Sequence, residues 1–296
     1  MKVATCRYQN RSHLAIIRGQ TALLPGLISR LTAFSGVLEL IRDFNRAGQL
    51  LEALSESEKD RATFSLNDVE LLPPIPRPAK NVMCLGLNYA DHVKETSAAG
   101  GQEARLPEHP IVFTKNVTSI TGPDSAIPYD PAATEQLDWE VELGVVIGKP
   151  GYAIDAARAM DHVFGYTVVN DLSARDLQFR HKQFFIGKSL DGGCPMGPWI
   201  VTADEISDPH ALAIRCTVNG ETKQDSSTRH MIFDIPAVIS TLSRGMTLEA
   251  GDIIATGTPD GVGFARTPPE FLQPGDEVVC EIEGIGVLRN TIAKPE

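Results

Sequence analysis

The chain has 296 residues, a formal net charge of -11 and 42% hydrophobic residues, a composition typical of a globular protein with one or two domains. Its acidity disfavours nucleic acid as a partner, because phosphate groups are bound by basic faces. No apolar run in the sequence reaches the roughly 18 to 20 residues of a membrane-spanning helix, and the N-terminus has no apolar signal core. We therefore expect a cytoplasmic protein that has no membrane partner.

The first 72 residues predict a small α+β domain. The segments "KVATCRY" and "HLAIIRG" fit a hairpin that turns at the polar "QNRS". Helical periodicity follows over residues 35–59, with Ser35 as a candidate N-cap. Four prolines in "LLPPIPRPAK" indicate a stiff connector, which we place at residues 73–79. The remaining residues, 80–296, are expected to form the larger domain.

The larger domain shows mostly strand patterns separated by glycine and proline. Helical patterns follow Tyr89 and cover about 173–184 and 234–245. Many strands with few helices predict a mostly β, α+β fold, a β-sandwich or rolled mixed sheet. Neither a dinucleotide-binding glycine fingerprint nor a P-loop is present. The strand-like segments are "NVMCLGLNY", "PIVFTK", "DWEVELGVVIG", "VFGYTVVND", "PWIVTA", "LAIRCTVNG", "GDIIATG" and "DEVVCEIEG".

Cysteines are scattered and offer no metal or disulfide pattern. They are five in number, without a C-x-x-C pair, which disfavours a zinc site or a disulfide scaffold. We expect buried, reduced thiols. The five are Cys6, Cys84, Cys194, Cys216 and Cys280.

The segment "EQLDWEVELGVVIGKPG" raises a problem of charge. Its apolar residues alternate as in a strand, which places Glu140 and Glu142 together on the opposite face. Like charges at this spacing repel each other, and burial adds to the cost. A bound cation would resolve the conflict, and pairing with arginine or lysine is the alternative.

Asp171 adds a third carboxylate where a predicted strand ends before a helix. Ligands often gather at such positions, although a turn or capping aspartate is the simpler interpretation. Three oxygen ligands without cysteine or histidine favour Mg²⁺, Mn²⁺ or Ca²⁺ over zinc.

Three further segments carry candidate groups for chemistry. In "GLNYADHVKE", His92 and Glu95 share a helix face, so the carboxylate can orient the imidazole as a base. Lys188 lies in a glycine-rich turn, and "ATGTPDGVG" offers backbone N–H groups and the Thr258 hydroxyl to a carboxylate. The alternatives are an exposed helical pair, a surface lysine and a tight turn.

Together these segments resemble the fumarylacetoacetate hydrolase family from about Pro78 to the C-terminus. The matching segments are "GLNYADHVKE", "DWEVELGVVIGK", "NDLSARDLQ", "GKSLDGGCPMGPWIV", "ATGTPDGVG" and "GDEVVCEIEGIGVLRN". The resemblance implies a mixed β-sandwich roll after a small N-terminal domain, assembled as a homodimer. It places the metal ligands at Glu140, Glu142 and Asp171, the water-activating dyad at His92 and Glu95 on a mobile lid helix, and the active-site lysine at Lys188. It places substrate contacts at Arg175, Gln178, Gly257 and Thr258.

The resemblance also implies the chemistry. Such enzymes act on small 2-oxo acids through an enolate stabilised by Mg²⁺ or Mn²⁺. The intact dyad favours hydrolysis of a C–C bond in an acylpyruvate. The alternative is an oxaloacetate keto–enol tautomerase, isomerase or decarboxylase, because two segments are especially similar to that branch. A non-catalytic binding protein for small acids is a remote alternative.

Two departures from the family pattern concern the substrate side of the site. Phe184 and Phe185 stand where relatives often show tryptophan. The stretch after the dyad, residues 96–109, is longer and richer in glycine and alanine than in many relatives. We expect these differences to affect the lid and the size of the substrate.

Overall fold

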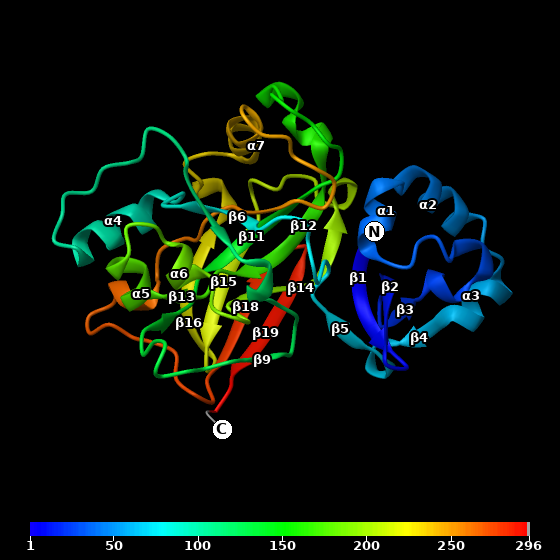
Figure 1. The fold of residues 1–296 in the computed structure, drawn as a ribbon, viewed down its shortest axis with the longest axis horizontal. Coiled ribbons are helices and arrows are strands. Elements are labelled where there is room, and N and C mark those ends of the chain that lie inside the picture. The colour runs from blue at the N-terminus through cyan, green and yellow to red at the C-terminus, as the bar shows by residue number, and fades with distance from the viewer. Residues whose placement is uncertain (295–296) are drawn as a thin grey trace.

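A computed structural model of the protein describes residues 1–294, and its largest element is a sheet of twelve strands (Figure 1). These strands are β1 (Lys2–Tyr8), β2 (Arg11–Arg18), β3 (Thr21–Leu23), β4 (Thr63–Ser65), β5 (Glu70–Leu72), β6 (Val82–Gly86), β7 (Ile111–Lys115), β8 (Ile120–Thr121), β11 (Val141–Ile147), β12 (Val163–Asn170), β14 (Cys194–Thr202) and β17 (Ile253–Ala255). The main path runs β4-β3-β2-β1-β14-β12-β11-β17-β6-β7, while β5 pairs with β1 and β8 with β14.

A second sheet of five strands packs against this one, in the order β16-β15-β18-β19-β9. Its strands are β9 (Ala126–Ile127), β15 (Ala213–Val218), β16 (Glu221–Ser227), β18 (Glu277–Ile282) and β19 (Gly286–Ile292), and a small ladder joins β10 (Leu137–Asp138) to β13 (Ser173–Ala174). Leu143 and Val145 of β11 share one buried cluster with Ile214 of β15 and Val278 of β18. This apolar layer makes the larger domain a sandwich, as the sequence predicts.

Seven α-helices are present in residues 1–294: α1 (Val37–Arg42), α2 (Phe44–Glu52), α3 (Glu56–Ala62), α4 (Ala90–Ala99), α5 (Arg175–Arg180), α6 (Phe185–Lys188) and α7 (Ile235–Ser243). The first three lie with the N-terminal strands on one side of the molecule, and α4 to α6 gather at the opposite end (Figure 1). Within the described part of the chain, each helix is too short or too polar to cross a bilayer.

The N-terminal region contains both strands and helices, as expected, but its helices do not begin and end where the sequence predicts. The hairpin of β1 and β2 is confirmed, with Gln9 and Asn10 at positive φ in its two-residue turn. The single helix expected over 35–59 is wrong, because Asp43 leaves the helical conformation between α1 and α2. Ser35 caps no helix. A capping box instead joins Ser55 to Glu58 at the start of α3.

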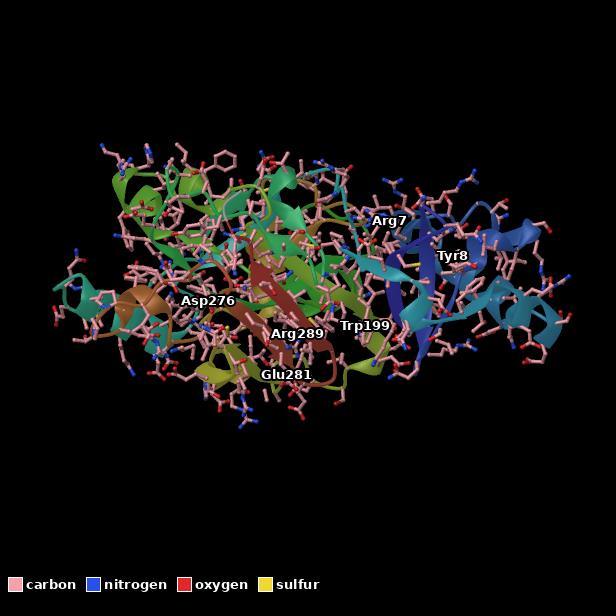
Figure 2. All side chains as sticks on the ribbon, turned by 90° about the horizontal axis from the view of Figure 1, so that it is seen from below. Arg7, Tyr8, Trp199, Asp276, Glu281 and Arg289 are labelled. Carbon is pink, nitrogen blue, oxygen red and sulfur yellow. The ribbon has the colours of Figure 1, made fainter. Side chains whose placement is uncertain are left out.

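The N-terminal strands are continuous with the larger sheet. Lys2 and Val3 of β1 pair with Val201 and Ile200 of β14. Trp199 lies where the two regions meet (Figure 2), with the ammonium of Lys2 4.7 Å from its ring centroid. The proline-rich residues after β5 lead directly into β6, and the domain boundaries at 72 and 80 stay predictions.

Candidate active site and metal centre

Glu140, Glu142 and Asp171 converge at one end of the central strand pair. Glu140 precedes β11, Glu142 lies within it, and Asp171 follows the paired strand β12. The amide of Asp171 donates to the carbonyl of Glu140 at 2.8 Å, which fixes the two strand ends together. Each side chain offers an oxygen, and these three atoms lie within 4.8 Å of one another. All three side chains are buried, with residue exposures of 4%, 0% and 0%.

Buried cations neutralise two of these carboxylates. The Nζ of Lys188 bridges them, 2.7 Å from Glu140 Oε2 and 2.8 Å from Asp171 Oδ2. The other oxygen of Asp171 accepts from Lys115 at 2.6 Å, and Glu140 Oε1 lies 2.7 Å from the guanidinium of Arg175. The alternative of pairing with lysine or arginine is therefore realised for Glu140, and Asp171 is paired with lysines as well.

Glu142 is different, because no cation in residues 1–294 pairs with it. Its Oε2 accepts from the amide of Gly257 at 2.8 Å. Its Oε1 is buried and has no hydrogen-bond partner in the described chain. Burial, reinforced by the charges of Asp171 and Glu140, raises the pKa of Glu142 well above its usual range. An orphaned carboxylate oxygen beside two others fits a hard divalent cation.

The pKa values of the paired groups follow their neighbours. Burial acts to raise the pKa of Glu140, but the charges of Lys188 and Arg175 outweigh it and hold the pKa below its usual range. Burial acts to lower the pKa of Lys188, and the charges of Asp171 and Glu140 outweigh it and raise the pKa. Both partners therefore stay ionised at neutral pH.

The buried charged side chains around the triad, which we call the cluster, have a formal net charge close to zero. Its buried ionisable side chains are four carboxylates and three cations: Asp138, Glu140, Glu142, Asp171, Lys115, Arg175 and Lys188. With all seven ionised, one negative charge remains. A divalent cation would change this total to one positive charge and make the site attractive to an anionic substrate.

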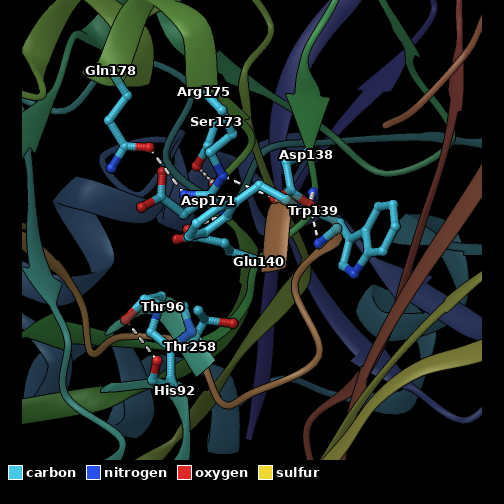
Figure 3. Close-up of polar contacts among 12 residues, drawn as sticks. His92, Thr96, Asp138, Trp139, Glu140, Asp171, Ser173, Arg175, Gln178 and Thr258 are labelled. Carbon is cyan, nitrogen blue, oxygen red and sulfur yellow. Dashed lines mark hydrogen bonds and ion pairs between the residues drawn. The ribbon is translucent and has the colours of Figure 1, made fainter. Parts of the chain in front are cut away.

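The predicted dyad is assembled on the helix α4. His92 Nδ1 lies 2.8 Å from Glu95 Oε1, which is the expected contact between residues three apart on a helix. Glu95 Oε2 accepts from the amide of Gly261 at 2.8 Å. With the carboxylate on Nδ1, the Nε2 of a neutral imidazole is left as a proton acceptor. Figure 3 shows His92 on the opposite side of the site from Arg175 and Gln178.

A cavity of about 490 Å³ brings most of the predicted site residues together. Those lining it are His92, Glu140, Arg175, Gln178, Lys188 and Thr258, with Leu85, Leu87, Phe113, Phe179, Phe184 and Phe264 as its apolar wall. The long stretch after the dyad also contributes, through Gly100 and Gln102. Glu142 and Asp171 are fully buried and do not line the cavity, but Lys188, which lines it, contacts Asp171 at 2.8 Å.

Arg175 and Gln178 are held in a network on α5. The Nε of Arg175 donates to Asp138 Oδ2 at 2.8 Å, and its Nη1 donates to Gln178 Oε1 at 3.0 Å. The ring centroid of Phe264 lies 4.5 Å from the guanidinium carbon. Figure 3 shows this network beside Glu140 and Asp171. Their proposed contact with substrate stays a prediction.

The glycine-rich loop after β17 serves the protein's own carboxylates. Gly257, whose φ is +95°, donates its N–H to Glu142, and a Cβ at this position would crowd Asn88. The Thr258 hydroxyl donates to the carbonyl of Val141 at 2.9 Å and accepts from Gln224 at 2.8 Å. Thr258 also lines the cavity, and the substrate contacts expected of both loop residues stay predictions.

Sequence reasoning missed two members of the cluster. Lys115 ends the apolar segment "PIVFTK", where a lysine at the end of an apolar strand is the only signal. Asp138 opens "DWEVE" and accepts from the amides of Gly263 and Phe264 as well as from Arg175. Its alternation with Glu140 and Glu142 was the available sign that it shares their face.

Comparison with known proteins identifies relatives along the whole chain. The family model described as Fumarylacetoacetate (FAA) hydrolase C-terminal matches residues 81–293. Oxaloacetate tautomerase YisK from Bacillus subtilis (strain 168) is 47% identical over 304 residues, covering 99% of this chain and 100% of the relative. The solved structure of Fumarylacetoacetate hydrolase (EaFAH) from psychrophilic Exiguobacterium antarcticum gives a TM-score of 0.82 at 40% identity, covering 100% of both chains. Maleylpyruvate hydrolase from Sphingobium sp. SYK-6, in complex with manganese (II) ion and pyruvate, gives 0.79 at 28% identity, covering 100% of both chains.

Proposed function

Because this chain belongs to the fumarylacetoacetate hydrolase family, we propose that it is a divalent-metal-dependent tautomerase that interconverts the keto and enol forms of oxaloacetate. The observation that carries the proposal is the buried triad of Glu140, Glu142 and Asp171, with the unpartnered Oε1 of Glu142, beside a cavity lined by His92. The name of the Bacillus subtilis relative supports oxaloacetate as the substrate.

The triad would hold Mg²⁺ or Mn²⁺, with Ca²⁺ as an ion of the same ligand preference. The Sphingobium structure that contains manganese supports this choice. When bound, the ion supplies a Lewis acid that stabilises negative charge on the 2-oxo oxygen of the substrate. The net positive charge that it would give the cluster suits a dicarboxylate.

The protein's own residues would move the proton. Tautomerisation breaks a C–H bond at C3 of the keto acid and forms an O–H bond at the 2-oxo oxygen, without any other reactant. His92 takes the C3 proton at Nε2 and returns it to oxygen, while Glu95 stabilises the imidazolium through Nδ1. Lys188 offsets negative charge on the enolate. Arg175, Gln178, Gly257 and Thr258 are proposed to orient the substrate.

Hydrolysis of an acylpyruvate is the second candidate, and the intact dyad favours it. In that reaction His92 would remove a proton from water, and the C–C bond would break to release the enolate of pyruvate. The apolar wall of the cavity, which includes Phe113, Phe179 and Phe264, suits an acyl group larger than anything in oxaloacetate. We place this reaction second because the relative named a tautomerase is 47% identical to this chain, whereas the two full-length matches named hydrolases are 40% and 28% identical.

One assay separates the two reactions. Oxaloacetate and a series of acylpyruvates are followed by the ultraviolet absorbance of their enols and by pyruvate detection, with Mg²⁺ or Mn²⁺ and with EDTA. We expect faster approach to keto–enol equilibrium of oxaloacetate, without pyruvate, and loss of activity with EDTA. Pyruvate formed from an acylpyruvate, without any acceleration of tautomerisation, would replace the first proposal by the second.

We also propose that the protein is a homodimer. Exposed apolar side chains gather along the edge strand β7 and the neighbouring helix α6, including Ile111, Val112, Phe185 and Ile186. An unpaired edge beside such side chains is typical of an interaction surface. Light scattering of the purified protein tests this assembly, and a monomer at micromolar concentration would refute it.

A further inference from the structure

Trp139 forms a contact that packing alone does not require. Its side chain is the largest one that is fully buried, and it points away from its neighbour Glu140 into the core between the sheets (Figure 3). The indole Nε1 donates a hydrogen bond to the carbonyl oxygen of Gly261 at 3.1 Å. Thus the residue next to a candidate metal ligand holds the glycine-rich loop that follows β17.

Gly261 continues this connection to the lid helix α4. Its N–H donates to Glu95 Oε2 at 2.8 Å, and the other oxygen of Glu95 contacts His92 Nδ1, also at 2.8 Å. Gly261 has a φ of +101°, and a Cβ at this position would collide with the carbonyl oxygen of Lys223. The peptide groups on both sides of Gly261 are therefore fixed in place by the fold, and only glycine fits between them.

We propose that Trp139 is a positioning residue for the His92–Glu95 dyad. Its indole N–H fixes the carbonyl of Gly261, and the amide of the same residue fixes Glu95. The connection sets where the lid helix places His92 relative to Glu140. The kinetic part of this inference rests on the proposed function, whereas its structural part does not.

The neighbouring residue Asp138 makes a parallel connection on the other face of the strand. Its carboxylate accepts from the amides of Gly263 and Phe264 and from Arg175. Consecutive residues therefore tie the same loop at two points, one that leads to the dyad and one that leads to the substrate side. The first connection depends on a single indole N–H, which makes it open to a conservative test.

The test compares Trp139→Phe with Trp199→Phe. Both tryptophans donate an indole N–H to a backbone carbonyl, but Trp199 donates to Ile285 at 2.7 Å, outside the candidate site. Both substitutions keep an aromatic ring and remove the donor. Trp199→Phe is therefore a matched control that leaves the lid and the turnover unchanged.

Hydrogen exchange of the metal-free variants, followed by mass spectrometry, reads the connection directly. One neutral hydrogen bond contributes about 1 kcal/mol, so we expect Trp139→Phe to speed exchange in the lid helix about fivefold. Trp199→Phe leaves that helix unchanged. Equal exchange of the lid helix in the two variants would overturn the proposal, whether or not the protein turns over any substrate.

Binding and turnover then separate positioning from a general packing effect. We expect Trp139→Phe to keep its Mn²⁺ affinity within about twofold and to lower kcat about five- to tenfold, with little change in KM, since the dyad rather than the metal carboxylates is displaced. Loss of Mn²⁺ affinity in parallel with kcat would identify Trp139 as a packing support of the metal strand and overturn the proposal.

A second variant keeps Trp139 intact and so does not depend on its replacement folding well. The ¹H–¹⁵N correlation NMR spectrum of the Trp199→Phe variant has one remaining indole N–H signal, which therefore belongs to Trp139. We expect Glu95→Ala, which removes the acceptor of the Gly261 amide, to shift this signal and to leave that of Trp199 in place. An unmoved Trp139 signal would show that the two ends of the connection are independent and would overturn the proposal.

Discussion

The Nζ of Lys115 lies 2.6 Å from Oδ1 of Asp171, and both side chains are fully buried. The same ammonium donates to the carbonyl of Leu172 at 2.8 Å. Asp171 thus carries an ammonium on each oxygen, because Lys188 contacts its Oδ2. Lys115 is outside the cavity lining, so its effect on the site runs through Asp171.

We expect Lys115→Met to destabilise the metal-free protein by about 3–5 kcal/mol, since it leaves Asp171 buried beside one cation fewer. Mn²⁺ would replace part of the missing charge and raise the melting temperature of the variant more than that of the wild type. Thermal unfolding with Mn²⁺ and with EDTA measures both effects. Lys149→Met, at an exposed position, is the control, and equal melting temperatures of the two variants with EDTA would contradict the prediction.

Glu140→Gln and Glu142→Gln should have opposite effects on the metal-free protein. Glu140 is paired with Lys188 and Arg175, so its neutralisation removes one negative partner from each of two buried cations, which keep only Asp171 and Asp138. Glu142 lacks a cationic partner and has a raised pKa, so burial of its charged form costs stability. An amide at position 142 resembles the protonated carboxyl and removes that cost.

With EDTA at neutral pH, we therefore expect Glu142→Gln to melt at or above the wild-type temperature and Glu140→Gln to melt clearly below it. Titration calorimetry with Mn²⁺ should show at least about 100-fold weaker binding for Glu142→Gln, because a charged ligand oxygen is lost. The direction of the change in melting temperature of Glu142→Gln tests whether Glu142 lacks a cationic partner. If Glu142→Gln melted as low as Glu140→Gln, the unpaired state of Glu142 would be refuted.

The cysteines provide a test that does not involve the site. All five are buried and free of disulfides, as the sequence predicts. Burial raises the pKa of Cys6 to about 12, so at pH 8 only about one thiol in ten thousand at this position is a reactive thiolate. We expect a thiol reagent to label the native protein slowly and all five thiols after unfolding in urea. Rapid labelling of the native protein would show that its core opens readily.

The sequence predicted the fold best where the spacing of apolar residues alone distinguishes a strand from a helix. Alternation in β11 places Leu143 and Val145 in the core between the sheets, as expected for a strand with two buried faces. The long periodic segment 35–59 did not remain one helix, because Asp43 breaks it and Ser55 starts a new one. Period alone does not locate such breaks, since apolar residues continue on both sides.

For the site, sequence reasoning located the groups but not their partners. The spacing of Glu140 and Glu142 predicted a shared face, and Asp171 joined them because β12 pairs with β11. Lys115 contacts Asp171 from a strand 56 positions away in the sequence, a distance over which no local pattern operates. No local pattern predicts the contact between the amide of Gly261 and Glu95 either, because it depends on how helix α4 packs against the loop after β17.

His92→Asn tests the role of the dyad in catalysis. A positioned base contributes about 10² to 10⁴ in rate, so we expect kcat for oxaloacetate tautomerisation to fall within that range. The Mn²⁺ affinity should be unchanged, because His92 belongs to the lid helix and not to the carboxylate triad. Stopped-flow absorbance of the enol and Mn²⁺ titration measure the two quantities. His13→Asn, in the N-terminal hairpin, is the control, and full turnover by His92→Asn would mean that another group moves the proton.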